Sequence, residues 1–261
     1  PSDWYVMLMN ELDETLSARG LATRIVFISY MDTAWPPQFE RIKNPTRFSL
    51  LSAPISRSYT ESVPADISDA TYTPYVRNNL TMFPTVAPYI KCAKDWQERC
   101  RVPAMLYEYH FWINQYLDPG VLKFARVVYD DIKNYKKHGL NGLINDCSQR
   151  SFWPNGFAFF VYGQAQFDTS VSFEALLEDY FSHAYGEDWR EVAAFFEKLG
   201  KAADFRYLNG KLSIDKEKGN YYNPALAEGF RKVSEIVEEF RPFVIAHKNM
   251  PMRAQTVSYR L

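Results

Sequence analysis

Carboxylates, an arginine, a histidine and several aromatic rings follow directly after four apolar segments of the sequence. In glycoside chemistry, one carboxyl group protonates the leaving oxygen, a second carboxylate attacks or stabilises the oxocarbenium-like carbon, and aromatic rings stack on sugar faces. The residue types found after these segments suit that chemistry. In chain order they are Tyr30, Asp32, Trp35, Arg57, Tyr59, Glu108, His110, Trp112, Asp146, Gln149 and Trp153.

Glu108 and Asp146 are the candidates for catalytic carboxylates, and the other residues named are candidates for substrate binding. Glu108 follows the apolar segment 104–107, which is typical of a short buried strand. Ligands bind at the C-terminal ends of parallel strands, so we expect Asp32, Arg57, Glu108 and Asp146 to line a single site. Simpler roles stay open, since a loop glutamate is often merely solvated, an aspartate often caps a turn, and Arg57 equally suits a structural ion pair.

Other functional motifs are missing from the sequence. It has no Gly-x-Ser-x-Gly elbow, no Gly-x-Gly-x-x-Gly fingerprint and no Walker loop, so hydrolase-triad, dinucleotide and nucleotide functions have no support. The four histidines and three cysteines lack metal-ligand spacing. Cys92 and Cys100 would be about 12 Å apart along a predicted helix, too far for a disulfide. We therefore predict no cofactor and no metal.

The composition narrows the choice of partners. The chain has 261 residues, 47% of them apolar, which predicts a sizeable core. Its 30 basic and 31 acidic residues include no basic run, so nucleic acid and anionic membrane surfaces are poor partners. No apolar run approaches the ~20 residues of a membrane span. No signal peptide is visible, but a chain opening Pro-Ser-Asp also fits a trimmed product, so the compartment stays open.

Apolar periodicity, glycines and prolines predict alternating strands and helices. The predicted strands are 24–29, 48–55, 104–107 and 140–144. The predicted helices are 2–19, 85–99, 119–137, 156–167, 173–185, 188–205 and 224–247. The first strand shows no polar alternation, which is typical of a strand covered on both faces.

Alternation of this kind implies parallel strands joined by right-handed crossovers. We therefore predict an α/β fold, in which 1–150 forms half of a TIM-like (β/α)8 barrel and 151–261 forms a helical domain. The strand-end candidates belong to the first of these domains.

Five short motifs, in their order along roughly residues 1–200, resemble the bacterial domain of unknown function 4838. That family is similar to glycoside hydrolases with a hexosaminidase-like barrel, and some members are grouped with endo-β-N-acetylglucosaminidases that act on N-glycans. The motifs are Ser29-Tyr30-Met31-Asp32-Thr33 with Pro36-Pro37, Ala53-Pro54-Ile55-Ser56-Arg57-Ser58-Tyr59, Tyr107-Glu108-Tyr109, Gly139-Leu140-Asn141-Gly142-Leu143, and Asp179-Tyr180-Phe181 with Ala184-Tyr185-Gly186.

The resemblance implies that this chain is the C-terminal half of a bacterial glycoside hydrolase-like barrel with a carbohydrate ligand. Its other partner would be the N-terminal half of the barrel, and its substrates would be glycans that contain N-acetylglucosamine. Family members carry an acidic motif upstream of a helix like 2–19, which this chain does not include. Where relatives have a Glu- and Gly-rich loop, this chain has Asn145-Asp146-Cys147-Ser148. A chain cut in this way should be inactive by itself.

Several roles are open for these residues. Glu108 would serve as nucleophile or base, or it would orient the acetamido group in substrate-assisted hydrolysis. A non-catalytic carbohydrate-binding module would instead use Trp35, Trp112 and Trp153. A structural domain without any ligand is the third possibility.

Overall fold

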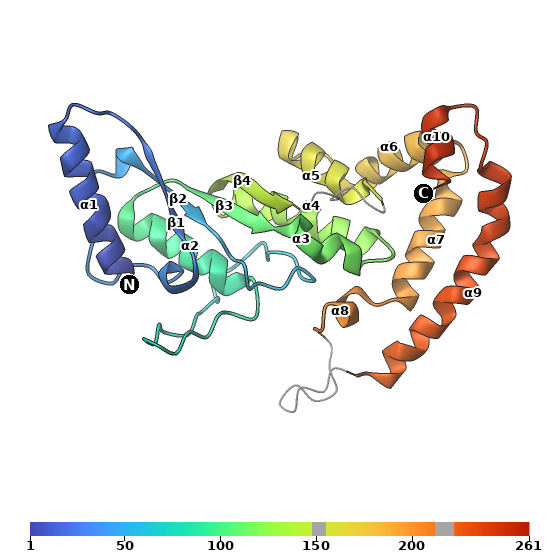
Figure 1. Cartoon of the computed structure of the whole chain (residues 1–261), viewed down its shortest axis with the longest axis horizontal. Coiled ribbons are helices and arrows are strands. Elements are labelled where there is room, and N and C mark those ends of the chain that lie inside the picture. Colours follow the sequence, from blue (N-terminus) through green and yellow to red (C-terminus); the bar gives the residue numbers. More distant parts are fainter. Residues whose placement is uncertain (148–154, 212–221, 261) are drawn as a thin grey trace. The chain divides into compact units, whose positions relative to one another are not determined.

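The computed structural model describes residues 1–147, 155–211 and 222–260 (Figure 1). The candidates Gln149 and Trp153 lie outside the described residues. The strands are β1 (Ile25–Ser29), β2 (Phe48–Ser52), β3 (Ala104–Tyr109) and β4 (Leu140–Cys147). The α-helices are α1 (Ser2–Ala18), α2 (Ala87–Cys100), α3 (His110–Ile113), α4 (Leu122–Lys137), α5 (Phe157–Phe167), α6 (Phe173–Tyr185), α7 (Trp189–Ala202), α8 (Phe205–Leu208), α9 (Pro224–His247) and α10 (Arg253–Ser258).

The α/β class is confirmed, and each predicted strand is present. The helix predicted over 188–205 ends earlier, at Ala202. A second, short helix then begins at Phe205, where the Asp204 side chain accepts hydrogen bonds from the backbone N–H groups of Arg206 and Tyr207. An aspartate at this position is a favoured N-cap, which explains the interruption.

The chain forms two compact units, whose boundaries differ from a single division at residue 150. The sheet unit comprises Pro1–Tyr109 and Lys133–Asp146, and the helical unit comprises His110–Ile132 and Cys147–Leu261. The first turns of α4 belong to the helical unit because their side chains bond to it. Tyr129 donates its hydroxyl to the carbonyl oxygen of Val171 at 2.7 Å, and Arg126 pairs with Glu174 at 2.7 Å.

The sheet unit is built on four parallel strands in the sequential order β1-β2-β3-β4 (Figure 1). Ile25 is paired in register with Phe48, and Leu50 with Ala104. The β3–β4 register shifts by one residue between Ala104 and Leu106, after which Glu108 lies opposite Asn145. Because all four strands are parallel, their C-terminal ends lie at one edge of the sheet.

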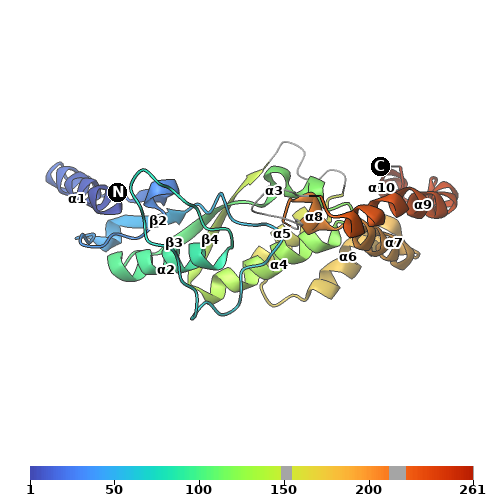
Figure 2. The same ribbon diagram turned by 90° about the horizontal axis from the view of Figure 1, so that it is seen from below.

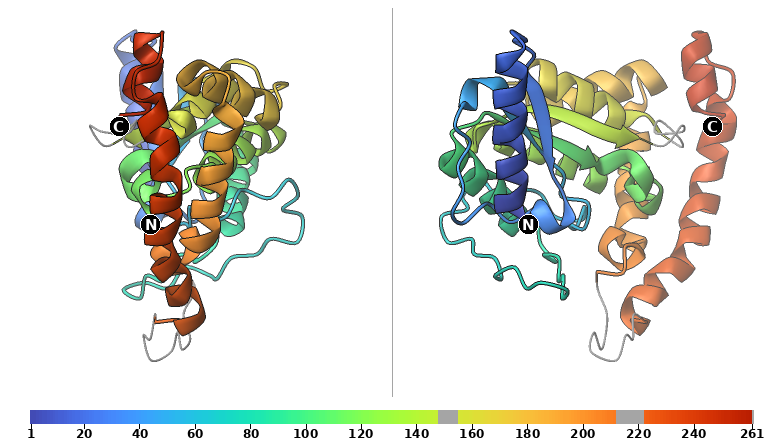
Figure 3. Two further views of the ribbon diagram at one scale, coloured as in Figure 1. Left: turned by 90° about the vertical axis from the view of Figure 1, so that its right-hand side faces the viewer. Right: turned by 60° about the vertical axis from the view of Figure 1, so that its left-hand side comes forward.

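One face of this sheet is covered by helices. α1 lies beside β1, as Figure 3 shows, and Val6 of α1 packs in the same cluster as Phe27 of β1. Trp96 of α2 is fully buried in that cluster, and Tyr135 near the end of α4 joins it. Figure 2 shows α2 running along the sheet. Every second strand residue faces this core, as the period-two geometry of a strand requires.

At β1 the opposite face of the sheet is open in this chain. Val26 of β1 is 57% exposed and Ile28 is 39% exposed, while their neighbour Phe27 is 3% exposed. The expectation that this strand is covered on both faces is therefore wrong for the chain as it stands. A strand that is covered on both faces reads as an apolar β-branched run. This pattern does not identify which segment covers the second face.

Helices α5 to α10 pack around aromatic side chains in the helical unit. Phe157, Phe173 and Phe181 meet edge to face, with centroid distances of 5.6 Å and 5.2 Å from the Phe157 ring. α7 and α9 lie side by side (Figure 3). None of the described helices has the length and apolarity that crossing a membrane would take.

Candidate functional site

Glu108 accepts hydrogen bonds at both side-chain oxygens and is fully buried. The Tyr59 hydroxyl donates to Oε2 at 2.6 Å. Oε1 accepts from Nη1 of Arg57 at 3.0 Å and from the Tyr135 hydroxyl. Glu108 and Arg57 are both inaccessible to solvent at their side chains, so this ion pair is shielded from water and salt.

Arg57 is held by the loop that carries it as well as by Glu108. Its Nη1 also donates to the Tyr135 hydroxyl oxygen at 2.7 Å, and its Nη2 donates to the backbone carbonyl of Glu61 at 3.2 Å. The guanidinium carbon lies 4.5 Å from the centre of the Tyr59 ring. A buried charge is tolerated only when it is paired and hydrogen-bonded, and Arg57 meets both conditions.

Tyr59 links the buried network of Glu108, Arg57 and Tyr135 to the end of β3. Burial raises the pKa of Tyr59 well above its usual value, and the negative charge of Glu108 raises it further. The phenol therefore stays protonated and donates to Glu108, while its oxygen accepts the backbone N–H of Tyr109 at 2.9 Å. The buried network thus fixes the backbone position of Tyr109.

Strand alternation separates Glu108 from the neighbouring tyrosines. Leu106 and Glu108 face the helices, so Tyr107 and Tyr109 point to the opposite face, where Tyr107 is half-buried and Tyr109 is 9% exposed. Tyr107 is paired with Ile144 of β4, and Asp146 stands two residues beyond Ile144 on the same face. The two carboxylates predicted to be catalytic therefore lie on opposite faces of the sheet.

Tyr109 is the centre of a second group of side chains. Burial, and then the neighbouring Tyr30, Tyr107 and Asp146, raise the pKa of Tyr109 to about 12. The Tyr107 and Tyr109 rings meet at a centroid distance of 5.3 Å. Asp146 is half-buried, and Tyr30 is 37% exposed. We call Tyr30, Tyr107, Tyr109 and Asp146 the strand-end cluster.

The strand-end cluster combines phenol hydroxyls, phenol ring faces and one carboxylate. Phenol hydroxyls donate hydrogen bonds to sugar hydroxyls, and a carboxylate accepts hydrogen bonds from them. The faces of phenol rings stack on sugar rings. Tyr107 and Tyr109 were not among the predicted site residues, although the period-two rule applied to the residues around Glu108 would have found them. Tyr135 carried no such signal, because it comes from a helix and meets Glu108 only in the folded chain.

Asp32 and Trp35 do not join either group. Asp32 is exposed, and the Tyr75 hydroxyl donates to it at 3.2 Å. Trp35 is 6% exposed and packs edge to face on Phe83, with its indole N–H bonded to the Thr73 carbonyl at 2.7 Å. Trp35 therefore belongs to the aromatic packing around Phe83, apart from the strand-end cluster.

His110 and Trp112 belong to the helical unit. Nε2 of His110 lies 2.8 Å from Oδ2 of Asp131, and both side chains are fully buried. This pair joins α3 to α4 inside the fold and is out of reach of a ligand. Trp112 is 52% exposed.

Comparisons of this chain with family models, with curated proteins and with solved structures find no match. Among the described residues, no group of three or more histidine, cysteine, aspartate or glutamate side chains is placed to hold a metal ion.

Proposed function

We propose that this chain is the sugar-recognising part of a glycoside hydrolase-like protein that acts on glycans containing N-acetylglucosamine. The observation that carries the proposal is the strand-end cluster: Tyr107 and Tyr109 of β3 share one face with Asp146 of β4 at the C-terminal ends of parallel strands, and Tyr30 follows the end of β1. Ligands bind at this end of parallel sheets. The sugar class comes from the resemblance to domain of unknown function 4838.

In this proposal Asp146 and Glu108 have different roles. Asp146 is half-buried and beside Tyr109, so it can contact a sugar and act as the catalytic carboxylate. Glu108 is fully buried on the other face, and it acts as a positioning residue through Tyr59 and the Tyr109 backbone. A second catalytic carboxylate would come from outside this chain.

The sheet also supports the proposal of a half-barrel. Strands in sequential order with right-handed crossovers place every connecting helix on one face, as they do in a closed barrel. The other face then becomes the barrel interior. On the edge strand β1 this face carries the exposed Val26 and Ile28, and the neighbouring α1 exposes Trp4 and Leu8. Further β/α units that precede α1 in a longer polypeptide would cover both surfaces.

A second candidate function is carbohydrate binding without catalysis. The observation that favours it is that Asp146 alone of the two predicted catalytic carboxylates is placed to reach a sugar, because Glu108 is buried and its oxygens accept from Tyr59, Arg57 and Tyr135. Such a module would bind sugar through the strand-end tyrosines and would leave Asp146 as an acceptor of sugar hydroxyls.

Calorimetric titration with N,N'-diacetylchitobiose tests the site in this chain. We expect binding that falls about ten-fold in Asp146→Asn and Tyr109→Phe, since each variant loses a hydrogen bond that involves a charge or a buried donor. Asp69→Asn is the matched control, because Asp69 is an exposed aspartate of the same unit. Equal binding by Asp146→Asn and Asp69→Asn would remove Asp146 from the site.

Hydrolysis separates the two candidate functions. In a polypeptide that also contains the upstream units, Asp146→Asn should lower the turnover of a chromogenic N-acetylglucosaminide by at least 100-fold if Asp146 is catalytic. A parent protein that binds the sugar but never cleaves it would support the binding module instead.

A further inference from the structure

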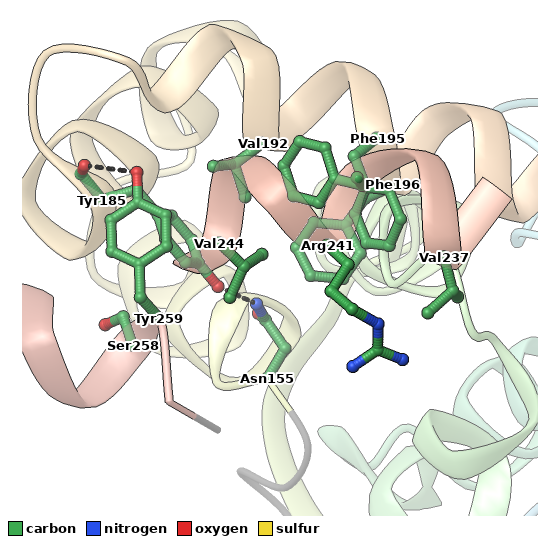
Figure 4. Close-up of a pocket in the computed structure, with 11 residues that line it drawn as sticks. Asn155, Tyr185, Val192, Phe195, Phe196, Val237, Arg241, Val244, Ser258 and Tyr259 are labelled. Carbon is green, nitrogen blue, oxygen red and sulfur yellow. Dashed lines mark hydrogen bonds between the residues drawn. The ribbon is translucent and has the colours of Figure 1, made fainter. Parts of the chain in front are cut away.

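A pocket of about 310 Å³ lies in the helical unit, among α6, α7, α9 and α10. Figure 4 shows the rings of Phe195 and Phe196 along one side of it, with Asn155 and Arg241 across from them. Pockets of roughly 300 Å³ and above, apolar with a few polar groups, are typical of small-molecule sites. This pocket does not depend on the strand-end cluster, which belongs to the sheet unit.

The apolar side of the pocket is made of rings that are held in place. Phe195 of α7 stacks on Phe240 of α9, with centroids 4.2 Å apart and planes 8° from parallel. Phe196 lies 5.4 Å from Phe195, and Val192 and Val244 extend the same lining. A flat apolar ring fits against such a wall, because aromatic rings gain from edge and offset contacts as well as from burial.

Tyr185 supplies a hydrogen-bond donor inside the pocket. It is buried, and its hydroxyl oxygen accepts from Nδ2 of Asn155 at 3.1 Å. Asn155 is itself oriented by the backbone N–H of Phe157, which donates to its Oδ1 at 2.8 Å. The hydroxyl hydrogen of Tyr185 has no acceptor among the described residues, so it can be donated to a ligand. Burial raises the pKa of Tyr185, which keeps that hydrogen in place at neutral pH.

Arg241 supplies a positive charge at the pocket. Its Nε and Nη2 donate to Glu238 at 2.8 Å and 2.7 Å in a half-exposed pair, which leaves the Nη1 amino group for another acceptor. Of the charged residues described, Arg241 alone lines the pocket. A ligand with an anionic oxygen therefore complements the site better than a neutral or cationic one.

We propose that this pocket binds a small aromatic carboxylate. The ring lies against Phe195 and Phe196, and the carboxylate lies on the polar side, where Arg241 provides the charge and Tyr185 a hydroxyl donor. A carboxylate also suits these donors because it accepts at two oxygens.

Isothermal titration calorimetry of the whole chain with naphthalene-2-carboxylate tests this proposal. We expect binding with a Kd below about 1 mM, at least ten-fold tighter than that of the neutral naphthalene-2-carboxamide. Arg241→Gln should abolish the preference for the acid, and Tyr185→Phe should weaken binding of the acid about ten-fold. Val244→Trp should fill the pocket and remove binding of both compounds.

Arg231→Gln is the matched control. Arg231 lies on the same helix and makes the same kind of pair, with Glu228 three residues earlier at 2.7 Å, but it does not line the pocket. Arg231→Gln should leave the affinity for the acid unchanged.

Tyr185→Phe keeps the buried ring, so this variant remains informative if Val244→Trp fails to fold.

Three results would overturn the proposal: no binding of the acid by the folded wild-type chain, equal affinity for acid and amide, or loss of affinity in Arg231→Gln as large as in Arg241→Gln. Because the variants lie in the helical unit, none of these results bears on chitobiose binding at the strand ends.

Discussion

Glu108 is the acceptor that three buried donors share. In Glu108→Gln the side chain loses its charge, and Arg57 keeps its own charge at a position without solvent access. Leaving a buried charge without its partner costs about 3–5 kcal/mol of the free energy of unfolding. We expect a loss of this size in urea denaturation.

Glu14→Gln is the control for this prediction, because it removes the carboxylate from an ion pair at the protein surface. Glu14 and Lys43 lie 2.8 Å apart, but both side chains are mostly exposed. Exposed pairs contribute little, so the denaturation midpoint should hardly move. If the two variants lose the same stability, Glu108 is not the counter-charge on which Arg57 depends.

The pairing of Arg57, Tyr59 and Glu108 illustrates how far the sequence predicts a site. Their positions after parallel strands correctly place them at one edge. Their burial could not be predicted, because it depends on Tyr135, which reaches Glu108 from the far end of α4. The opposite orientation of Asp146 depends on a one-residue shift of register between β3 and β4, and no sequence pattern specifies that shift.

At the scale of elements, Gly120 lets two segments of the helical unit approach closely. A Cβ added to Gly120 would lie 2.5 Å from the Cα of Gly200 in α7, which is backbone and cannot rotate away. Gly120→Ala should therefore force α7 outward and cost about 1–3 kcal/mol. Thermal unfolding followed by circular dichroism measures this loss.

Gly163→Ala is the control for that prediction. Gly163 lies within α5, and a Cβ built there has no neighbour within 4 Å. Alanine is the better helix former by about 0.5–1 kcal/mol, so this variant should melt at the same or a higher temperature. A loss of stability in Gly163→Ala as large as that in Gly120→Ala would argue against a close approach at Gly120.

The element boundaries follow closely from glycine, proline and capping residues. The helices over 173–185 and 224–247 have the predicted bounds, because Ser172 and Asn223 accept hydrogen bonds from the first helical N–H groups. The open face of β1 was beyond prediction, since it depends on where other strands lie. The division into units depends likewise on tertiary contacts of α4 that no local pattern encodes.

At the scale of the whole molecule, buried tyrosines in both units predict sensitivity to alkali. The pKa values of Tyr89, Tyr109 and Tyr259 are each raised to about 12, chiefly by burial, against about 10 in an unfolded chain. Between these values the unfolded chain loses protons that the folded chain keeps. The free energy of unfolding should therefore be highest below about pH 10 and fall as the pH rises to about 12.

Urea denaturation at a series of pH values, with tyrosinate absorbance recorded in parallel, checks this expectation. The part of the tyrosinate signal that comes from these three buried tyrosines should appear together with unfolding rather than before it. Full ionisation of the tyrosines in a chain that stays folded would contradict their burial.

β1 is an edge strand whose outer backbone groups pair with no described strand, and Val26 and Ile28 stand exposed beside them. A free edge with apolar side chains is a template on which strands of other chains can add. In a concentrated solution of this chain alone, intermolecular pairing at β1 is then the route by which aggregation would begin. A lysine in place of Val26 would block that route without touching either site.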